Sequence, residues 1–266
     1  MTVAHLSHSP ASPVAPDATT RDFYVSALRA LDHAQVPYLV GGGYAMAHYT
    51  GIQRSTKDLD LFVRPEDRDR TLTTLTAAGY KTEFYYPFWI SKALHGEAFI
   101  DILYGSGNGI CVVDDEWFAS AGEIDVHGFR APMVPPEEQL WSKAFVQDRD
   151  RFDGADIAHL ILRQGHAFDW RRLVRRFRGH ERVLLAHLLL FEYVYPTERG
   201  RVPEWVPTRL NELIQSEVPT DERLCRGTNL AVRGYGTAVR EWGFADARVQ
   251  PHGPLTPDEL GQLPEP

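Results

Sequence analysis

The chain has 266 residues, enough for one large domain or two small ones with a substantial apolar core. Its 28 basic and 36 acidic side chains give a net charge of −8, which disfavours broad non-specific nucleic-acid binding but leaves a local basic patch open. The two cysteines lack zinc or redox spacing, the N-terminus lacks a signal-peptide pattern, and the longest apolar stretch (183–191) is too short for a bilayer, so we expect a cytoplasmic protein without membrane association.

Residues 1–18, rich in Ser, Pro and Ala, are expected to form a flexible tail. Beyond them, apolar spacing and the positions of glycine and proline predict alternating helices and strands. The expected helices are 21–35, 43–50 and a segment from Pro65 to near Gly79. The expected strands are 37–41, 57–63, 80–86, 88–94 and 97–103, with 110–113 and 129–134 as weaker candidates.

The pattern changes after Pro135-Pro136, where helical spacing replaces alternation. Helices are expected at 137–146, 153–164, 168–178, 181–193 and 208–216, and no firm prediction is made for 224–247. The proline-rich end, 251–266, is expected to be loose. The sequence therefore predicts an α+β fold with a small mixed β-sheet flanked by helices over 19–134, followed by a mainly helical region over 135–250.

Two carboxylates and a glycine pair stand close together in the first half of the chain. Gly42 and Gly43 follow an apolar strand, and Asp58-Leu59-Asp60 opens the next strand. Because side chains repeat every two residues along a strand, Asp58 and Asp60 point to one face and repel each other. A divalent cation with oxygen ligands is the simplest compensation, and glycines at a helix start let backbone N–H groups approach phosphate. A metal beside a phosphate indicates a nucleotide.

Asp101 is a third strand-borne carboxylate, flanked by apolar residues much as Asp60 is. The three aspartates converge if their strands are neighbours in one sheet. Such a set can hold two divalent ions, which clamp the attacking and leaving oxygens of a phosphoryl transfer. Asp101 is also placed to accept the proton of an attacking hydroxyl.

These residues together resemble the nucleotidyltransferase superfamily built on the DNA-polymerase-β-like fold. The string Gly42-Gly43-Tyr44-Ala45, His48, Arg54-x-Thr56-Lys57-Asp58-Leu59-Asp60-Leu61 is most similar to a bacterial branch that includes abortive-infection toxin-like and antibiotic-modifying members. In that branch a proline-led helix with a lysine follows, here Pro136 and Lys143. The resemblance covers about residues 21–165, and 166–266 are not assigned by it.

The resemblance implies nucleotidyl transfer from a nucleoside triphosphate (NTP) bound as a magnesium complex. It implies two Mg²⁺ ions, with Mn²⁺ as an alternative, held by Asp58, Asp60 and Asp101. Gly42 and Gly43 are then expected to cradle the β- and γ-phosphates through their backbone N–H groups. Arg54, Thr56 and Lys143 are further candidate nucleotide contacts. Alternatively, Arg54 and Lys143 form ordinary surface ion pairs, and Thr56 is present because it suits the start of a strand.

The acceptor is a hydroxyl compound whose identity the sequence leaves open. A small molecule such as an antibiotic is favoured by the acidic charge balance, and a tRNA or a protein, as in toxin-like members, is the alternative. Two other functions also stay open: a catalytically silent nucleotide-binding module, and a sugar-nucleotide transferase that uses the Asp-x-Asp motif. Oligomeric state is not predicted.

A run of arginines lies on the helix expected at 168–178. Five of them are Arg171, Arg172, Arg175, Arg176 and Arg178. Spacing of three and four residues places Arg171, Arg175 and Arg178 on one face. The first interpretation is a solvated helix that pairs with the acidic remainder of the chain, and an RNA-contacting stripe is the alternative.

Overall fold

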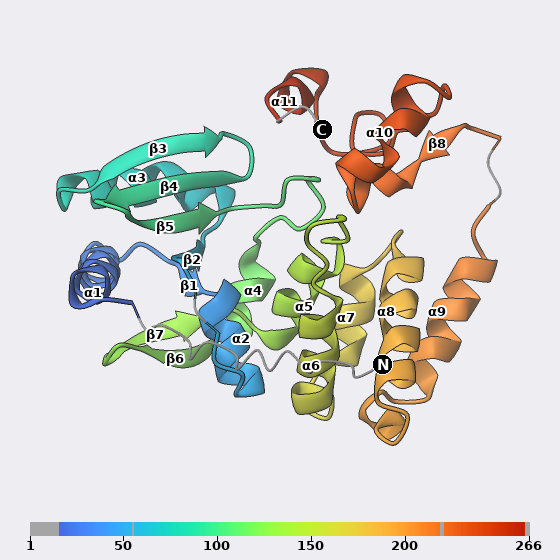
Figure 1. Cartoon of the computed structure of the whole chain (residues 1–266), viewed down its shortest axis with the longest axis horizontal. Coiled ribbons are helices and arrows are strands. Elements are labelled where there is room, and N and C mark those ends of the chain that lie inside the picture. The colour runs from blue at the N-terminus through green and yellow to red at the C-terminus, as the bar shows by residue number, and fades with distance from the viewer. Residues whose placement is uncertain (1–15, 55, 219–220, 264–266) are drawn as a thin grey trace, which may run out of the picture.

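The computed structural model describes residues 16–54, 56–218 and 221–263 (Figure 1). Most of the expected flexible tail, 1–15, lies outside the described residues. Helix α1 (Ala18–His33) begins three residues earlier than the sequence pattern predicts. Its start is set by Asp17, whose side chain accepts a hydrogen bond of 2.7 Å from the Thr20 N–H and so satisfies one of the free donors of the first turn.

A seven-stranded mixed sheet forms the centre of the first half, in the order β3-β4-β5-β2-β1-β7-β6. Its strands are β1 (Leu39–Val40), β2 (Asp58–Phe62), β3 (Lys81–Tyr86), β4 (Ile90–His95), β5 (Ala98–Leu103), β6 (Gly122–Val126) and β7 (Phe129–Met133). The β2–β5 and β1–β7 pairs are parallel, and the other pairs are antiparallel. The predicted α+β class with a mixed sheet is therefore confirmed.

Helices flank this sheet (Figure 1), and its apolar residues are buried in the core. After α1 these are α2 (Gly42–Thr50), the 3-10 turn η1 (Pro65–Asp67), α3 (Arg68–Ala77) and α4 (Asp115–Ala119). The strand residues Leu59, Leu61 and Ile100 are fully buried, as is Leu28 of α1. Removing such side chains from water is the main free-energy gain that fixes β2 and β5 at the middle of the sheet.

The second half is mainly helical and adjoins the sheet through α2. Its elements are α5 (Pro136–Ala144), α6 (Gly154–Gln164), α7 (Trp170–Arg176), α8 (Glu181–Val194), η2 (Arg199–Arg201), α9 (Trp205–Gln215), β8 (Leu224–Cys225), η3 (Arg226–Asn229), α10 (Val232–Arg240), β9 (Ala245–Asp246) and α11 (Pro257–Gly261). Helix α2 packs against α5 and α6, and α8 packs between α6 and α9. Figure 1 shows α5 to α9 side by side, with α10 and α11 across the end of this layer.

Two local predictions are wrong. The candidate strand at 110–113 is an irregular segment, and two of its side chains, Cys111 and Val113, are buried in the core without joining the sheet. The end of the chain, expected to be loose, contains α11, which has a capping box between Thr256 and Glu259.

Both cysteines, Cys111 and Cys225, are free and buried. Among the described helices, none combines the length and the apolar character that crossing a bilayer requires.

Candidate active site

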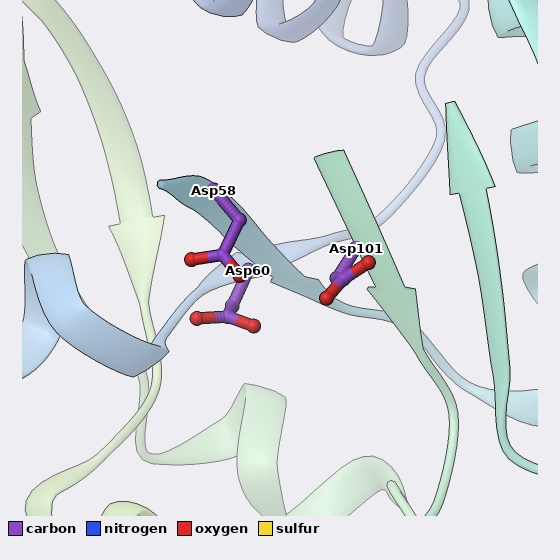
Figure 2. A group of neighbouring side chains, drawn as sticks. All are labelled: Asp58, Asp60 and Asp101. Carbon is purple, nitrogen blue, oxygen red and sulfur yellow. The ribbon is translucent and has the colours of Figure 1, made fainter. Parts of the chain in front are cut away.

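Three aspartates from two neighbouring strands lie together at the centre of the sheet (Figure 2). Strands β2 and β5 are parallel, and their register places Asp60 directly beside Asp101, with Asp58 two residues earlier on β2. Residues directly opposite each other, and residues two apart on one strand, share a face of the sheet. One carboxylate oxygen from each of the three residues lies within 4.8 Å of the others. The predicted convergence is confirmed.

The three carboxylates of this cluster repel one another, because their negative charges lie close together. Burial, followed by the charges of Asp58 and Asp101, raises the pKa of Asp60 to about 7. Burial also raises the pKa of Asp101, although its ion pair with Lys92 opposes the shift. A nearby cation stabilises the ionised form of such a carboxyl group. The three aspartates are therefore suited to a divalent metal, for which oxygen ligands are preferred.

Gly42 lies so close to Asp60 that no side chain fits at this position. A Cβ atom on Gly42 would stand 1.6 Å from Asp60 Oδ2. The residue also has a φ of +56°, in the left-handed region that glycine adopts without strain. The glycine therefore lets the first turn of α2 lie directly against a carboxylate of the cluster.

Thr56 lies beside Gly43 and leaves little space for a side chain there. A Cβ on Gly43 would lie 3.1 Å from the Cβ of Thr56. The hydroxyl of Thr56 donates to the side chain of Asp58 at 2.8 Å and to its backbone carbonyl at 3.0 Å. The structure thus places Thr56 as a residue that orients Asp58, a contact that the sequence pattern does not reveal.

Gln139 of α5 holds the glycine turn from the other side. The Gly42 N–H donates to Gln139 Oε1 at 3.2 Å, and Gln139 Nε2 donates to the Gly42 carbonyl at 3.4 Å. The side chain of Gln139 is buried. The two residues are 97 positions apart, so this contact follows from the packing of α5 on α2 and has no local sequence signal.

The two candidate phosphate-binding cations both form ion pairs within the protein. Arg54 pairs with Asp156 at 2.6 Å, and its side chain is 55% exposed. Lys143 is largely buried and contacts both Asp153 and Asp156 at 2.9 Å. Its positive charge also reaches Asp60, whose pKa it lowers against the stronger effects of burial and carboxylate repulsion. Arg54 is therefore an exposed partner of Asp156, whereas Lys143 is buried and its charge acts on the acidic cluster.

Replacing Lys143 by methionine is expected to lower the free energy of unfolding by about 3–5 kcal/mol, because it leaves buried carboxylates without their central cation. Urea unfolding measures this loss. As a control, Arg182→Met removes an ion pair with Glu217 whose arginine side chain is 56% exposed. This change is expected to cost no more than about 1 kcal/mol. Equal effects of the two substitutions would show that Lys143 is not a structural cation.

The arginines of α7 divide between buried ion pairs and a surface cavity. Arg172 is buried against Glu137 and Glu138, and Arg176 pairs with Asp114 and Glu138. The face predicted from spacing, Arg171, Arg175 and Arg178, lines a cavity between α7 and α9. Arg175 pairs with Glu116. Pairing with the acidic remainder of the chain therefore accounts for much of this helix.

Two further residues near the cluster are not among the sequence-based candidates. Lys92 donates to Asp101 at 2.5 Å across the β4–β5 hairpin, and its ammonium group lies 4.1 Å from the centre of the Phe99 ring. Arg151 pairs with Asp153. The Lys92 contact has a sequence signal: a hairpin turn at Gly96 brings Lys92 opposite Asp101 by counting residues along the two strands.

A helix that glycine opens beside an Asp-x-Asp strand, with a third aspartate on the next parallel strand, defines the arrangement of a nucleotidyltransferase. The chain belongs to the family described as uncharacterised nucleotidyltransferases, whose family model matches residues 19–194. The match includes the glycine pair and all three aspartates. No curated protein matches the chain in sequence.

Solved structures show weaker similarity to the chain. The antibiotic-resistance factor ANT(2'')-Ia is 20% identical, with 65% of this chain and 98% of that chain covered and a TM-score of 0.45. The lincosamide antibiotic adenylyltransferase LnuA, bound to lincomycin, is 21% identical over 53% of this chain and 94% of that chain, with a TM-score of 0.38. An antigenic nucleotidyltransferase-like protein from Paracoccidioides brasiliensis is 15% identical, with coverages of 76% and 95% and a TM-score of 0.41. The family assignment therefore rests on the family model.

Proposed function

We propose that this protein transfers a nucleoside monophosphate from an NTP to a hydroxyl acceptor and releases pyrophosphate. The observation that carries the proposal is the cluster of Asp58, Asp60 and Asp101, whose oxygens lie within 4.8 Å of one another. Membership of a nucleotidyltransferase family supports the same reaction and favours it over a sugar-nucleotide transferase. In this reaction the acceptor oxygen forms a bond to the α-phosphorus, and the bond from that phosphorus to the leaving pyrophosphate breaks.

The donor atoms of the cluster fit a hard divalent cation. Three carboxylates converge, and mutual repulsion with burial raises the pKa of Asp60. Asp58, Asp60 and Asp101 would hold Mg²⁺, with two ions as the expected number and Mn²⁺ as an alternative. When bound, the metal neutralises charge on the triphosphate and stabilises the attacking and leaving oxygens.

The chain's own residues supply positioning and a proton acceptor. Thr56 fixes the carboxylate of Asp58. Asp101 is proposed to accept the proton of the acceptor hydroxyl, because burial raises its pKa and makes its carboxylate a stronger base. The Gly42 N–H, which the sequence assigns to phosphate, already donates to Gln139, so phosphate oxygens are proposed to lie against the Gly43 N–H in the first turn of α2. Lys143 is proposed to add a positive charge on the phosphate side, since its charge reaches Asp60.

A transfer assay tests this proposal directly. The protein is incubated with each α-³²P-labelled NTP, Mg²⁺ and a panel of hydroxyl compounds that includes aminoglycosides, lincosamides, nucleosides and bulk tRNA. We expect labelled acceptor and pyrophosphate in equal amounts with wild type. Absence of label on every acceptor, together with no NTP binding in the presence of Mg²⁺, would contradict the proposal. NTP binding without transfer would instead favour the catalytically silent nucleotide-binding module.

Metal binding is expected to strengthen with pH up to about 7, because a cation must displace the proton that Asp60 retains below its raised pKa. If one proton is displaced, the dissociation constant for Mn²⁺ falls about tenfold from about pH 5.5 to about pH 6.5 and levels off above about pH 7.5. Calorimetric titration with Mn²⁺ at these pH values measures the slope. A pH-independent constant, or binding that persists in Asp60→Asn, would place the cation elsewhere.

A further inference from the structure

Helices α7 and α9 border a cavity on the surface of the helical half. Its volume is 790 Å³, within the range of about 300–1,000 Å³ that is usual for sites of small molecules. Residues of α7 and of the segment that follows it form one wall, and residues of α9 form the other. Among the described residues that line the cavity, none belongs to the cluster of three aspartates or to the start of α2. The cavity is therefore separate from the proposed reaction centre.

Positive charge gathers in this cavity, although the chain as a whole is acidic. The charged side chains of the lining are four arginines and two glutamates: Arg171, Arg175, Arg178, Arg209, Glu181 and Glu212. The net charge of the whole chain is −8. A concave surface with an excess of one charge focuses its field and raises the local concentration of the opposite ion. The lining therefore favours an anion.

The two glutamates of the lining are already engaged. Glu212 pairs with Arg209 at 3.0 Å along α9. Glu181 is buried, and its carboxylate accepts a hydrogen bond of 3.0 Å from the Gly179 N–H. Neither carboxylate pairs with an arginine of the opposite wall, so the charges on the α7 side are left for another partner.

Two of the arginines on that side have no carboxylate partner. Arg175 pairs with Glu116 at 2.8 Å, outside the lining. In residues 16–54, 56–218 and 221–263, neither Arg171 nor Arg178 forms an ion pair, and both are exposed. The other arginines of α7 pair with carboxylates of α5. The inward arginines thus stabilise the fold, whereas the charges of Arg171 and Arg178 remain available to a ligand.

An aromatic ring lies beside these charges. Trp205 lines the cavity and is 42% exposed, and the guanidinium of Arg171 lies 5.8 Å from the centre of its ring. A cation–π contact of this kind orients the guanidinium without neutralising its charge. The exposed face of the indole also offers a flat apolar surface for the organic part of a ligand.

A phosphate group matches this arrangement better than a carboxylate does. Guanidinium groups donate paired hydrogen bonds to phosphate oxygens. A phosphomonoester carries a charge of about −1.5 to −2 at neutral pH and three acceptor oxygens, so one group can engage two arginines. The volume of 790 Å³ leaves room for an organic group beside the phosphate. The expected ligand is therefore a phosphate ester.

We propose that this cavity is an anion site that binds the phosphate of a phosphate ester, with Arg171 and Arg178 as the charged contacts and Trp205 against the organic part. The inference goes beyond the proposed function, because the site lies outside the reaction centre and requires neither the metal nor the triphosphate. Two sources have this chemistry, a free phosphomonoester and the phosphodiester backbone of a single-stranded RNA, and binding measurements separate them.

Isothermal titration calorimetry with the full chain in the presence of EDTA tests the proposal, because EDTA removes metal-dependent binding of a triphosphate at the reaction centre. The probes are ribose 5-phosphate, phenyl phosphate and a short single-stranded RNA without terminal phosphates. Benzoate is the matched anion that lacks phosphate. Wild type is expected to bind at least one phosphate probe and to bind benzoate more weakly than phenyl phosphate.

The double variant Arg171→Gln/Arg178→Gln is expected to weaken this binding by at least about tenfold, since it removes charged hydrogen-bond donors. The matched control, Arg130→Gln/Arg199→Gln, removes the same charge from exposed arginines outside the lining and should bind as wild type does. Arg178→Glu is a second, single variant that should weaken binding through repulsion. The ion pairs of the described chain are untouched by the changes at Arg171 and Arg178, so the melting temperature is expected to stay close to that of wild type.

The two sources give different results. Binding of either phosphomonoester, weakened in the cavity variants, assigns the site to a free phosphorylated molecule. Binding of the RNA without the monoesters assigns it to a strand, and the slope of log affinity against log salt should then fall by about 0.7 for each arginine removed. Binding of no probe by wild type, an equal loss in the control variant, or benzoate bound as tightly as phenyl phosphate overturns the inference. The transfer assay tests the proposed function separately from all of these outcomes.

Discussion

Replacing Asp60 by asparagine is expected to lower kcat/KM for nucleotidyl transfer by about 10²–10³-fold or more, the scale seen when one preorganised group that stabilises transition-state charge is removed. Asp60 lies between Asp58 and Asp101, with one oxygen of each within 4.8 Å. The amide keeps the shape of the side chain but removes the negative charge. The loss is therefore expected in turnover and in Mn²⁺ affinity together, measured by label transfer and calorimetry.

The same substitution is expected to leave the metal-free protein at least as stable as wild type. The folded-state pKa of Asp60 is raised to about 7 from the ordinary carboxyl value of 3.8. A raised carboxyl pKa means that stability present at low pH is lost as pH rises through that value. At about pH 8 the asparagine avoids this loss, so its melting temperature should equal or exceed that of wild type. Asp69→Asn, on an exposed part of α3, is the control and should leave activity unchanged. Activity of Asp60→Asn within a few-fold of wild type would remove Asp60 from the reaction.

Substitution of Gly42 by alanine is expected to reduce transfer to a similar extent, through geometry rather than charge. The added Cβ would stand 1.6 Å from Asp60 Oδ2, so either the carboxylate or the start of α2 must move. Displacements of about 1 Å in a catalytic group are associated with losses of about 10²-fold. Alanine at a φ of +56° also adds backbone strain of about 1–3 kcal/mol. Transfer rates and thermal unfolding measure the two effects separately.

Gly51 provides the matched control for Gly42. It ends α2 in the left-handed region with a φ of +75°, and nothing stands within 4 Å of the position of a Cβ there. Gly51→Ala therefore carries the same kind of backbone strain without touching the cluster. We expect both variants to lose stability through backbone strain, with a further loss for Gly42→Ala from the clash with Asp60, and a large loss of transfer only for Gly42→Ala. Equal activity of both would mean that the approach of Gly42 to Asp60 has no role in the reaction.

Much of the central sheet follows from local patterns in the sequence. The alternation over 57–63 and 97–103 predicts strands β2 and β5, and the aspartates fall on matching positions of these strands. Burial explains why the prediction succeeds. Leu59 and Leu61 occupy the opposite face of β2 and are fully buried, so a shift by one residue would move the acids into the apolar core and the leucines to the face of the cluster.

The contacts that orient the cluster could not be predicted in the same way. Gln139 reaches Gly42 across 97 residues, and Lys143 meets Asp156 only because α5 packs on α6. Such contacts depend on helix packing, which leaves no periodic signal in either segment. Lys92 is the exception, because its pairing with Asp101 follows from a hairpin of known register.

The other elements that were predicted wrongly or not at all have local causes. The segment 110–113 is apolar because Cys111 and Val113 fill the core, and apolar content alone does not distinguish a strand from a buried loop. Helix α4 has only five residues, too few for a periodic pattern. Helix α10 contains Gly234 and Gly236, each unfavourable in a helix, so its sequence gives no helical prediction.

A crystal structure with Mn²⁺ and a non-hydrolysable NTP would show directly whether the three aspartates hold the cation, since anomalous scattering locates the metal without assumptions about the nucleotide. We expect an anomalous peak between Asp58, Asp60 and Asp101, with the triphosphate against the first turn of α2. A nucleotide bound away from this cluster, or a cation held by other side chains while the three aspartates stay unliganded, would contradict it.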